Sequence, residues 1–365
     1  MTSHKSLLAA AALLAAACAG KPAGDPAPVK GQSATFAARN AFDFTLPETG
    51  KDVQIWCVLP QDDPLQEVVS LDVTAPLAHE VTKDSEGNKV LHLHGPVPAG
   101  GKFAVVTDFT VKRYRQVPSV DAATSGSCTD EDRKRLAKDL APNTNVVLSD
   151  EVRRTAHDIC AGETNEVAKA RRIYDWVLAN VDYWVKDPEH KKASPVGSSE
   201  YCMSNRTGNC TDFHSLYAAL SRAEGIPTRM VYGSLFKPEL DGQDKDASYH
   251  CWIEFWAPGQ GWVPLDVAVA DIYVGDFPTT DANAEKVRLT TADGYSGAEP
   301  AKVDFYFGGL DERRVTFSSG RDITLSPPAA AGPVNHLPKA WVELDGQTVA
   351  EKSGWTRKFT YREVR

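Results

Sequence analysis

The stretch TGNCTDFHSL, at residues 207–216, carries the strongest prediction about the fold of this chain. It begins as a turn and continues with apolar residues at helical spacing, and Gly225 followed by Ile-Pro predicts the end of the helix. The apolar stripe of this helix consists of Phe213, Leu216, Tyr217 and Leu220. Cys210 therefore lies at or near a helix N-terminus, where unpaired backbone N–H groups favour a thiolate and stabilise an oxyanion. Taken alone, a cysteine in this position is more often structural than reactive.

A second stretch, residues 249–266, predicts two strands joined by a turn that contains Pro and Gly. Strand alternation puts His250 and Trp252 on one face and Cys251 on the other. If the strands pair across the turn, Asp266 falls opposite Trp252, within ~8 Å of His250 on the same face. A carboxylate at that distance can orient an imidazole, and an oriented imidazole can take the proton of a thiol.

These residues and their surroundings resemble the transglutaminase core domain of the papain-like superfamily. His250 follows Cys210 by 40 residues, and Asp266 follows His250 by 16 residues. The motifs that carry the resemblance are GNCTDFHSL at 208–216, RAEGIPTR at 222–229, HCWIEF at 250–255 and GWVPLD at 261–266. The resemblance implies that Cys210 is the nucleophile, that His250 is the general base and acid, and that Asp266 orients the histidine.

The resemblance extends over roughly residues 53–365 and points to exported bacterial proteins known as transglutaminase-like cysteine proteases. Further matching motifs are WCVLPQ at 56–61, FYFGGLDERRV at 305–315 and GRDITL at 320–325. The fold class it implies is α+β. In the papain-like core, a helix bundle that carries the cysteine packs on an antiparallel sheet, and a β-sandwich domain precedes this core.

Five neighbouring residues are expected to shape the site. Tyr183 and Trp184 line the cleft or donate to the oxyanion, because aromatic residues flank the cysteine in related sites. Asn209 is a further donor, and Trp252 shares the face of His250. His214 lies on the same helix face as Cys210 and either modulates the thiolate or is a packed helix histidine.

The N-terminus predicts export. Residues 7–17 are an uninterrupted Leu/Ala run, which is too short to span a membrane but suits a signal peptide. Small residues precede Cys18, as in a bacterial lipobox, so Cys18 is the expected lipidation site. Ala19 after it favours the periplasmic face of the outer membrane by resemblance to lipoprotein sorting rules. The alternative is a plain secretory signal that is cleaved nearby.

The remaining chain divides by composition and periodicity. The predicted parts are a signal peptide at 1–18, a flexible tether at 19–40, a β-sandwich at 41–117, a connection at 118–148, a transglutaminase-like catalytic domain at 149–330, and a C-terminal β-hairpin packed on that domain at 331–365. Within the catalytic part, residues 150–181 are predicted helical and residues 193–209 a loop. Residues 276–300 are polar and predict a surface insertion.

The chain has seven cysteines, and export permits disulfides. Spacing does not determine their connectivity, and Cys128–Cys160 is one of many pairings. Cys202 is near Cys210 in the sequence and is a candidate to restrain its loop, or to regulate it by forming a disulfide. The alternative is a metal site. Its ligands would be Cys202, Cys210, His214, His250 and Cys251, but their spacing matches no familiar zinc pattern.

The predicted function is thioester chemistry on amide bonds, with hydrolysis favoured over transfer to an amine. Expected substrates are peptides or proteins, including peptidoglycan peptides, and no cofactor or calcium motif is recognisable. A net charge of −9 without a Lys/Arg-rich run excludes a nucleic-acid partner. The alternative is a non-catalytic binding module of transglutaminase fold at the cell envelope.

Overall fold

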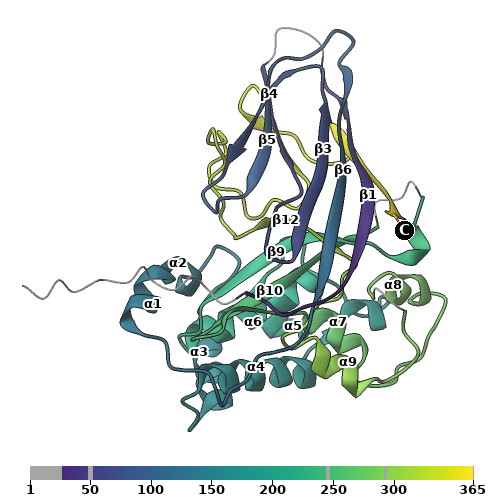
Figure 1. Cartoon of the computed structure of the whole chain (residues 1–365). Coiled ribbons are helices and arrows are strands. Elements are labelled where there is room, and N and C mark those ends of the chain that lie inside the picture. Colours follow the sequence, from purple (N-terminus) through teal and green to yellow (C-terminus); the bar gives the residue numbers. More distant parts are fainter. Residues whose placement is uncertain (1–26, 48–51, 244–246, 292–293, 365) are drawn as a thin grey trace, which may run out of the picture.

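The computed structural model describes residues 27–47, 52–243, 247–291 and 294–364. Long strands form an upper β-sandwich, and the helices gather in the lower part against a shorter sheet (Figure 1). The α+β fold that the sequence predicts is confirmed. The predicted signal peptide, Cys18 and part of the predicted tether lie outside the described residues. Among the described helices, none combines the length and apolar character that crossing a membrane requires.

A four-stranded antiparallel sheet of order β11-β10-β9-β12 belongs to the lower part. Its strands are β9 (Thr228–Leu235), β10 (Tyr249–Ala257), β11 (Gly261–Leu265) and β12 (Arg314–Ser319). The hairpin predicted at residues 249–266 is formed by β10 and β11. Their pairing runs from Ala257 opposite Gly261 to Ile253 opposite Leu265. Asp266 therefore follows directly on the last paired residue, on the side where the hairpin prediction places it.

Helix α6 (Cys210–Ala223) packs against this sheet and is buried along its length, from Cys210 to Arg222. The helices that contact or neighbour it are α3 (Asp150–Cys160), α4 (Glu166–Asn180), α5 (Ser199–Asn205) and α7 (Val267–Ile272). Because helices and sheet enclose α6, its burial extends beyond the apolar stripe that its spacing predicts. The nucleophile candidate thus sits on the central helix of the core.

Two local predictions differ from the structure. The helical region at 150–181 is two helices, because Gly162, with a φ of 74°, takes a left-handed conformation just after α3. The loop predicted at 193–209 contains α5 and the short strand β8 (Thr207–Gly208), which pairs in parallel with β7 (Asp182–Tyr183). This pairing brings Tyr183 beside the start of α6.

The other short elements of the lower part are α1 (Asp130–Arg135), α2 (Ala137–Leu140), α8 (Ala284–Arg288), α9 (Pro300–Phe305), and the 3₁₀ turns Trp184–Lys186 and Pro238–Leu240. The predicted surface insertion at 276–300 carries α8 and is anchored to the core. Val287 is buried, and the buried Asn283 donates a hydrogen bond from Nδ2 to the carbonyl oxygen of Lys186 at 2.9 Å. The polar composition of this segment therefore did not reveal that some of its side chains face inward.

The β-sandwich consists of two antiparallel sheets, of order β15-β1-β6-β3 and β14-β13-β2-β5-β4. The first contains β1 (Lys30–Thr45), β3 (Gln66–Thr74), β6 (Lys102–Gln116) and β15 (Trp355–Val364). The second contains β2 (Asp52–Val58), β4 (Ala78–Lys83), β5 (Lys89–Pro96), β13 (Ala340–Leu344) and β14 (Gln347–Thr348). Alternate residues of β1 and β15 are buried, as a sheet with one covered face requires.

The structure corrects the predicted domain boundaries. Residues 331–365 are not a separate unit, because their strands complete the two sheets of the sandwich. Trp355 of β15 pairs with Phe44, and Trp341 of β13 pairs with Trp56. In addition, β1 begins inside the predicted tether at 19–40. Local alternation predicts that a segment is a strand, but it does not identify the strand that will be its neighbour.

The sandwich and the lower part share one apolar core. Phe36, Phe109 and Phe359 of the sandwich pack with Phe236 and Phe317 from the chain around β9 and β12. The rings of Phe36 and Phe236 are stacked with their centroids 4.0 Å apart, and those of Phe317 and Phe359 meet edge to face at 5.8 Å. The last strand of the chain therefore supports the sheet that carries the candidate site.

The six cysteines in the described part of the chain are all free thiols. The suggested Cys128–Cys160 disulfide is therefore wrong. Cys128 packs with Leu136 and Trp256, whereas Cys160 belongs to the core around α6. The two side chains are buried in different clusters, so their spacing in the sequence carried no information about pairing.

Replacing Phe359 by Ala should lower the free energy of unfolding by about 3–5 kcal/mol, because it leaves a cavity where the two parts share their core. Urea unfolding followed by circular dichroism measures the change. Thr356→Ala, at an exposed position of the same strand, is the matched control and should stay within about 0.5 kcal/mol of the wild type. Equal stabilities of the two variants would contradict a shared core.

Candidate active site

Cys210 is the first residue of α6, and a capping box fixes the helix end on which it lies. The side chain of Asn209 accepts hydrogen bonds from the N–H groups of Thr211 and Asp212 at 2.9 and 3.1 Å. The Asp212 carboxylate in turn accepts from the N–H of Asn209 at 2.9 Å. The Oδ1 of Asn209 therefore caps the helix, whereas its Nδ2, the group that the sequence suggested as an oxyanion donor, is 3.5 Å from the carbonyl oxygen of Ser194.

Asp212 also holds the loop that precedes the helix, a role that the sequence analysis did not assign to it. Its carboxylate accepts hydrogen bonds from the N–H of Ser194 at 3.0 Å and from the N–H of Ser198 at 2.8 Å. Burial raises its pKa, and these hydrogen bonds oppose the rise. The signal was present in the sequence, because Asn209 followed three residues later by Asp212 is a capping pattern.

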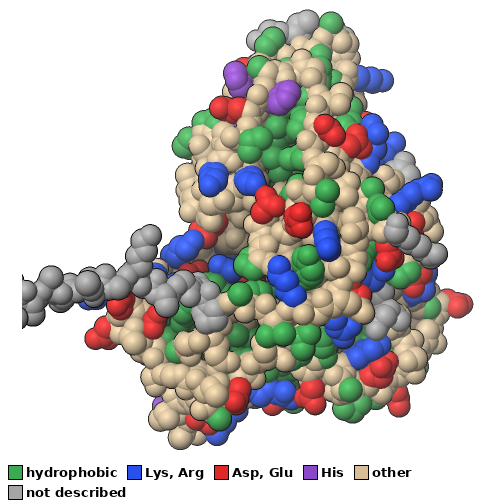
Figure 2. All heavy atoms as spheres, in the orientation of Figure 1, with side chains coloured by type: hydrophobic (Ala, Val, Ile, Leu, Met, Phe, Trp, Pro, Cys, Tyr) green, Lys and Arg blue, Asp and Glu red, His purple; other side chains and the backbone are tan. Residues whose placement is uncertain are grey.

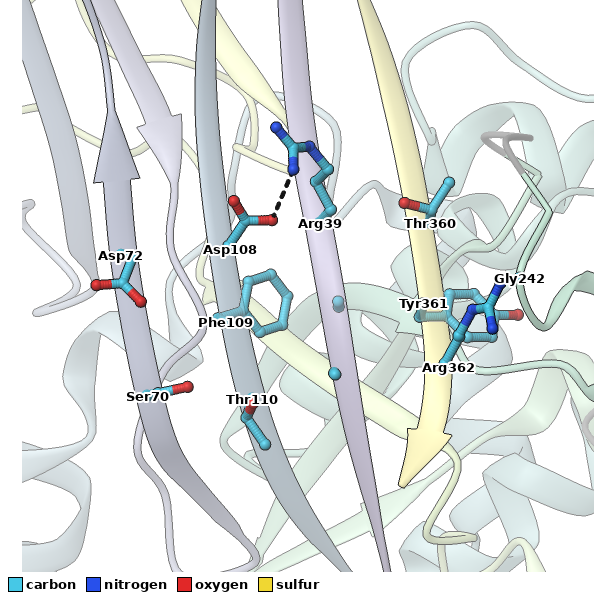
Figure 3. Close-up of a pocket in the computed structure, with 12 residues that line it drawn as sticks. Arg39, Ser70, Asp72, Asp108, Phe109, Thr110, Gly242, Thr360, Tyr361 and Arg362 are labelled. Carbon is cyan, nitrogen blue, oxygen red and sulfur yellow. Dashed lines mark ion pairs between the residues drawn. The ribbon is translucent and has the colours of Figure 1, made fainter. Parts of the chain in front are cut away.

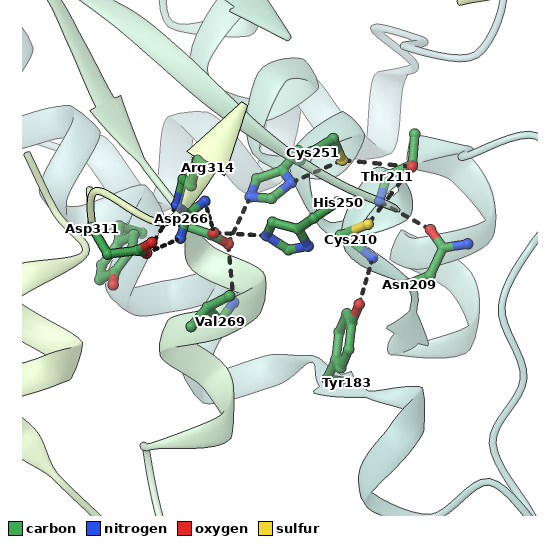
Figure 4. A network of polar contacts seen from close by, with 12 residues as sticks. Tyr183, Asn209, Cys210, Thr211, His250, Cys251, Asp266, Val269, Asp311 and Arg314 are labelled. Carbon is green, nitrogen blue, oxygen red and sulfur yellow. Dashed lines mark hydrogen bonds and ion pairs between the residues drawn. The ribbon is translucent and has the colours of Figure 1, made fainter. Parts of the chain in front are cut away.

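The imidazole of His250 lies between Asp266 and Cys210 (Figure 4). His250 Nε2 is 2.7 Å from Asp266 Oδ2, so the other ring nitrogen, Nδ1, is the one available to the thiol. The two side chains act on each other electrostatically, because His250 lowers the pKa of Cys210 and Cys210 raises the pKa of His250. The structure therefore brings together the three residues Cys210, His250 and Asp266 that the sequence pattern singled out.

Asp266 is held from three further directions. Its Oδ1 accepts a hydrogen bond from the N–H of Val269 at 3.0 Å, which caps α7. The guanidinium of Arg314, on β12, is 2.6 Å from its Oδ2 and also pairs with Asp311 at 2.8 Å. His214 Nε2 is 3.5 Å from its Oδ1. The sequence did not identify Arg314 as a site residue, because Arg314 is distant from Asp266 in the chain and no local pattern links the two.

These contacts set the charge states of the three residues. A hydrogen bond from the Cys251 thiol, together with the charge of His250, holds the pKa of Cys210 well below the usual thiol value, against the effect of burial. Burial would lower the pKa of His250, but the Asp266 carboxylate raises it to about 9. Although burial opposes ionisation of Asp266, His250 and Arg314 hold its pKa well below the usual range. These pKa shifts favour a thiolate on Cys210 and a charged imidazole on His250.

Tyr183 contacts the reactive end of α6, as the sequence analysis anticipated for an aromatic neighbour. Its hydroxyl oxygen accepts a hydrogen bond from the N–H of Cys210 at 3.1 Å. Its own N–H donates to Asp271 at 2.9 Å, and Lys186 pairs with the same carboxylate at 2.8 Å. Burial raises the pKa of Asp271 to about 6. Trp184 is partly buried against the helical core and has a packing role.

His214 and Trp252 are both buried. His214 lies in the core beside Asp266, and its Nδ1 is 3.5 Å from the sulfur of Cys251. Trp252 packs against the guanidinium groups of Arg314 and Arg113, whose central carbons are 5.3 and 6.0 Å from the ring. Trp252 therefore braces the ion pair behind the site, and does not line an opening at Cys210.

Two hollows elsewhere on the molecule are not built for this chemistry. One lies between the sandwich and the β9–β12 sheet, where Trp252, Arg229 and Glu254 meet Asp62 and Asp63. The other is an open hollow on the outer face of sheet β15-β1-β6-β3, where Arg39 pairs with Asp108 at 3.4 Å (Figure 3). Neither is lined by the cysteine, histidine and aspartate of the site.

On the face of the molecule shown in Figure 2, basic and acidic side chains are interspersed. Across the described residues, no group of three or more His, Cys, Asp or Glu side chains is arranged to hold a metal ion. The cluster of cysteines and histidines considered as a metal site therefore does not have the required geometry.

Residues 153–267 match the family model of the transglutaminase-like superfamily. This chain carries a transglutaminase-like domain. The matched segment contains all three residues of the candidate site, from the helix that begins at Cys210 to the end of the hairpin at Asp266. The sandwich strands and β12 lie outside it.

A solved structure supports the fold beyond this domain. The crystal structure of a candidate cysteine protease from Cytophaga hutchinsonii aligns with a TM-score of 0.54 and 16% sequence identity, over 92% of this chain and 99% of that chain. At this identity the similarity establishes the fold alone. It includes the sandwich together with the transglutaminase-like domain.

Two curated relatives match parts of the chain. An uncharacterized protein from Haemophilus influenzae is 27% identical over 210 residues, which are 52% of this chain and 51% of that protein. A protein-glutamine gamma-glutamyltransferase from Pseudomonas aeruginosa is 34% identical over 76 residues, or 19% of this chain and 11% of the transferase. The chain thus covers about half the length of the first relative and a small part of the second.

Replacing Arg314 by Leu should destabilise the protein by about 3–5 kcal/mol, because it leaves the buried carboxylate of Asp266 without its guanidinium partner. Thermal unfolding measures this change. Arg39→Leu is the matched control, because its ion pair with Asp108 is exposed and should contribute less than about 1 kcal/mol. If both variants unfold at the same temperature, the Arg314–Asp266 pair does not support the site.

The alkylation of Cys210 by iodoacetamide should be nearly independent of pH between neutrality and pH 9, because the thiolate is already formed. For an ordinary thiol with a pKa near 8.5, the rate would rise about tenfold per pH unit below that value. Turnover should fall above about pH 9, where His250 loses the proton that Asp266 holds on it. Rapid-quench alkylation with peptide mapping gives the first profile, and initial rates give the second. An alkylation rate that climbs through pH 8.5 would contradict the ion pair.

Proposed function

We propose that this protein is a cysteine enzyme that cleaves or transfers amide-linked acyl groups of peptides or proteins through a thioester on Cys210. The observation that carries the proposal is the position of His250, which lies between the Asp266 carboxylate and the Cys210 thiolate. The transglutaminase-like domain and the fold shared with a candidate cysteine protease support the same reaction class. A cysteine buried for structural reasons would not need an oriented, charged imidazole.

In the first step, the Cys210 sulfur attacks the carbonyl carbon of the amide. The resulting oxyanion accepts a hydrogen bond from the hydroxyl of Tyr183, whose oxygen is held by the N–H of Cys210. Tyr183 is suited to donate because burial and the nearby Cys210 raise its pKa, which keeps the phenol protonated. His250 then passes its proton to the departing amine, the C–N bond breaks, and a thioester remains.

In the second step, neutral His250 takes a proton from the incoming nucleophile, which attacks the thioester carbonyl and releases the Cys210 sulfur. Asp266 keeps the same imidazole nitrogen bonded throughout, so the other nitrogen always faces the reacting atoms. Water as the nucleophile gives hydrolysis, which we favour, and an amine gives transfer. The local similarity to a glutamyltransferase makes a glutamine side chain the acyl donor to test first for the transfer reaction.

We further propose that the protein acts outside the cytoplasm, where a lipid on Cys18 would anchor it to the periplasmic face of the outer membrane. The Leu/Ala run and the small residues before Cys18 support this location. Substrates would then be envelope proteins or peptides, including the peptide stems of peptidoglycan. Mass spectrometry of the mature N-terminus would identify the lipid, and an unmodified chain that begins after Cys18 would overturn the anchor.

Incubation with a panel of glutamine-containing peptides, other peptides and peptidoglycan stem peptides should give an acyl adduct on the wild-type protein and none on Cys210→Ala. Intact-mass spectrometry after acid quench detects the thioester. Cys202→Ser, which alters a buried cysteine on α5, is the matched control and should keep the adduct. Adducts on Cys210→Ala, or turnover by it, would exclude Cys210 as the nucleophile.

The same experiment separates the two acceptors when a primary amine is added. If water is the acceptor, the released acid forms at a rate that the amine does not change. If the enzyme is a transferase, the amide of the added amine replaces the acid as the product. Failure of every donor to label a protein whose Cys210 alkylates rapidly would limit the substrate class, and slow alkylation would contradict the proposal itself.

A further inference from the structure

A second thiol lies beside Cys210 and has no part in the mechanism above. Cys251 follows His250 on β10, is fully buried, and faces α6 (Figure 4). The Cys251 thiol lowers the pKa of Cys210, and Cys210 in turn raises the pKa of Cys251. The hydroxyl of Thr211 is 3.5 Å from the Cys251 sulfur and 4.0 Å from the Cys210 sulfur. The two sulfur atoms therefore share one small polar space.

Cys251 also has a histidine of its own. His214 Nδ1 is 3.5 Å from the Cys251 sulfur, and its Nε2 is 3.5 Å from Asp266 Oδ1. His214 therefore lies between Cys251 and Oδ1 of Asp266, just as His250 lies between Cys210 and Oδ2 of Asp266. His214 is completely buried, so its contact with a thiol on one side and a carboxylate on the other is not accidental surface packing. It is placed to accept a proton from Cys251.

We propose that Cys210 and Cys251 are an oxidative modification site, at which a hydroperoxide converts the two thiols into a reversible disulfide with His214 as the base. This inference rests on the proposed function only in taking Cys210 as a reactive thiolate. In this proposal the disulfide partner of Cys210 is Cys251, whereas the sequence suggested Cys202. Cys202 lies on α5, where burial and the Asp212 carboxylate raise its pKa.

With hydrogen peroxide as the oxidant, the Cys210 thiolate attacks one peroxide oxygen and the O–O bond breaks. Cys210 becomes a sulfenic acid, and the departing hydroxide takes the proton of His250 and leaves as water. Cys251 then gives its proton to His214, and its sulfur attacks the sulfenic sulfur. The S–O bond breaks, and the second hydroxide takes the proton from His214. In total, two thiols and one peroxide give one disulfide and two waters.

The consequence of this step is reversible protection of the nucleophile. A sulfenic acid without a neighbouring thiol can be oxidised further to a sulfinic acid, which thiol reductants do not reverse. A disulfide stops that progression and is opened again by a dithiol. Cys251 is suited to this part because burial and Cys210 raise its own pKa, so it stays protonated until His214 takes the proton.

The test compares the wild type with Cys251→Ser and Cys202→Ser, using the full chain treated with hydrogen peroxide and then with dithiothreitol. Before oxidation, the wild type and Cys202→Ser should alkylate rapidly at Cys210, and the alkylation of each oxidised protein is compared with the rate of the same protein before oxidation. After oxidation, the wild type should lose two hydrogen atoms in mass, yield a cross-linked Cys210–Cys251 peptide, and recover its alkylation with dithiothreitol. Cys202→Ser should behave like the wild type. Cys251→Ser should instead gain two oxygen atoms on Cys210 and recover little alkylation.

A wild-type protein that gains oxygen on Cys210 without a cross-link would overturn the proposal, and so would a disulfide to any other cysteine. Because the readouts are mass and alkylation, these failures leave the acyl-transfer function intact. Slow alkylation of the unoxidised protein would instead defeat the proposed function. Circular dichroism of Cys251→Ser checks that the variant is folded.

His214→Gln provides a second test if Cys251→Ser does not fold. Relative to sulfenic acid formation in the same variant, which a dimedone probe traps, the disulfide step should be slower by at least about tenfold. A purely structural histidine would change both steps together through loss of the fold. An unaltered rate of disulfide formation would remove His214 from the proposed sequence of proton transfers.

Discussion

The carboxylate of Asp266 has no exposure to solvent, and burying such a charge costs several kcal/mol unless it is paired and hydrogen-bonded. Four groups meet that cost here: the Arg314 guanidinium, the imidazoles of His250 and His214, and the N–H at the start of α7. They come from β12, β10, α6 and α7, so the four elements must be in register before the charge can be accommodated. The position of the His250 imidazole follows from the same requirement.

The β-sandwich contributes to this arrangement through β12. The buried Gln66 of the sandwich accepts a hydrogen bond from the N–H of Thr316 at 2.8 Å and donates one to its carbonyl oxygen at 3.1 Å. Arg113, on β6, pairs with Asp63 at 3.0 Å next to the same strand. Arg314 lies two residues before Thr316, so the sandwich fixes the strand that supplies the cation for Asp266. This connection explains physically why the sandwich and the domain share a core.

Two histidines contact this one carboxylate, and each histidine has a thiol on its other side. The environments of the two thiols make them chemically different. Cys210 starts a capped helix, receives a hydrogen bond from Cys251 and faces a charged His250, so it is the thiolate. Cys251 is in the middle of the core beside that negative charge, so it stays protonated. The difference in reactivity therefore arises from position, since the two side chains are the same.

The sequence by itself determined the features that depend on local periodicity. A helix beginning at Cys210, a hairpin carrying His250 and Asp266, and the class of chemistry these residues support could all be predicted, because helix caps, strand alternation and short turns act over a few residues. The spacing of Asn209 and Asp212 also predicts the capping role of Asn209, because the two residues of a capping box are three positions apart.

Only the tertiary structure decided which distant segments meet. Arg314 on Asp266, Cys251 beside Cys210, Tyr183 on the N–H of Cys210, and the C-terminal strand within the sandwich all join elements far apart in the chain. Residue patterns state which face of an element is apolar, but they do not state which partner will cover it. The buried charge of Asp266 and the shared aromatic core select those partners, because they are satisfied only when the whole chain is folded.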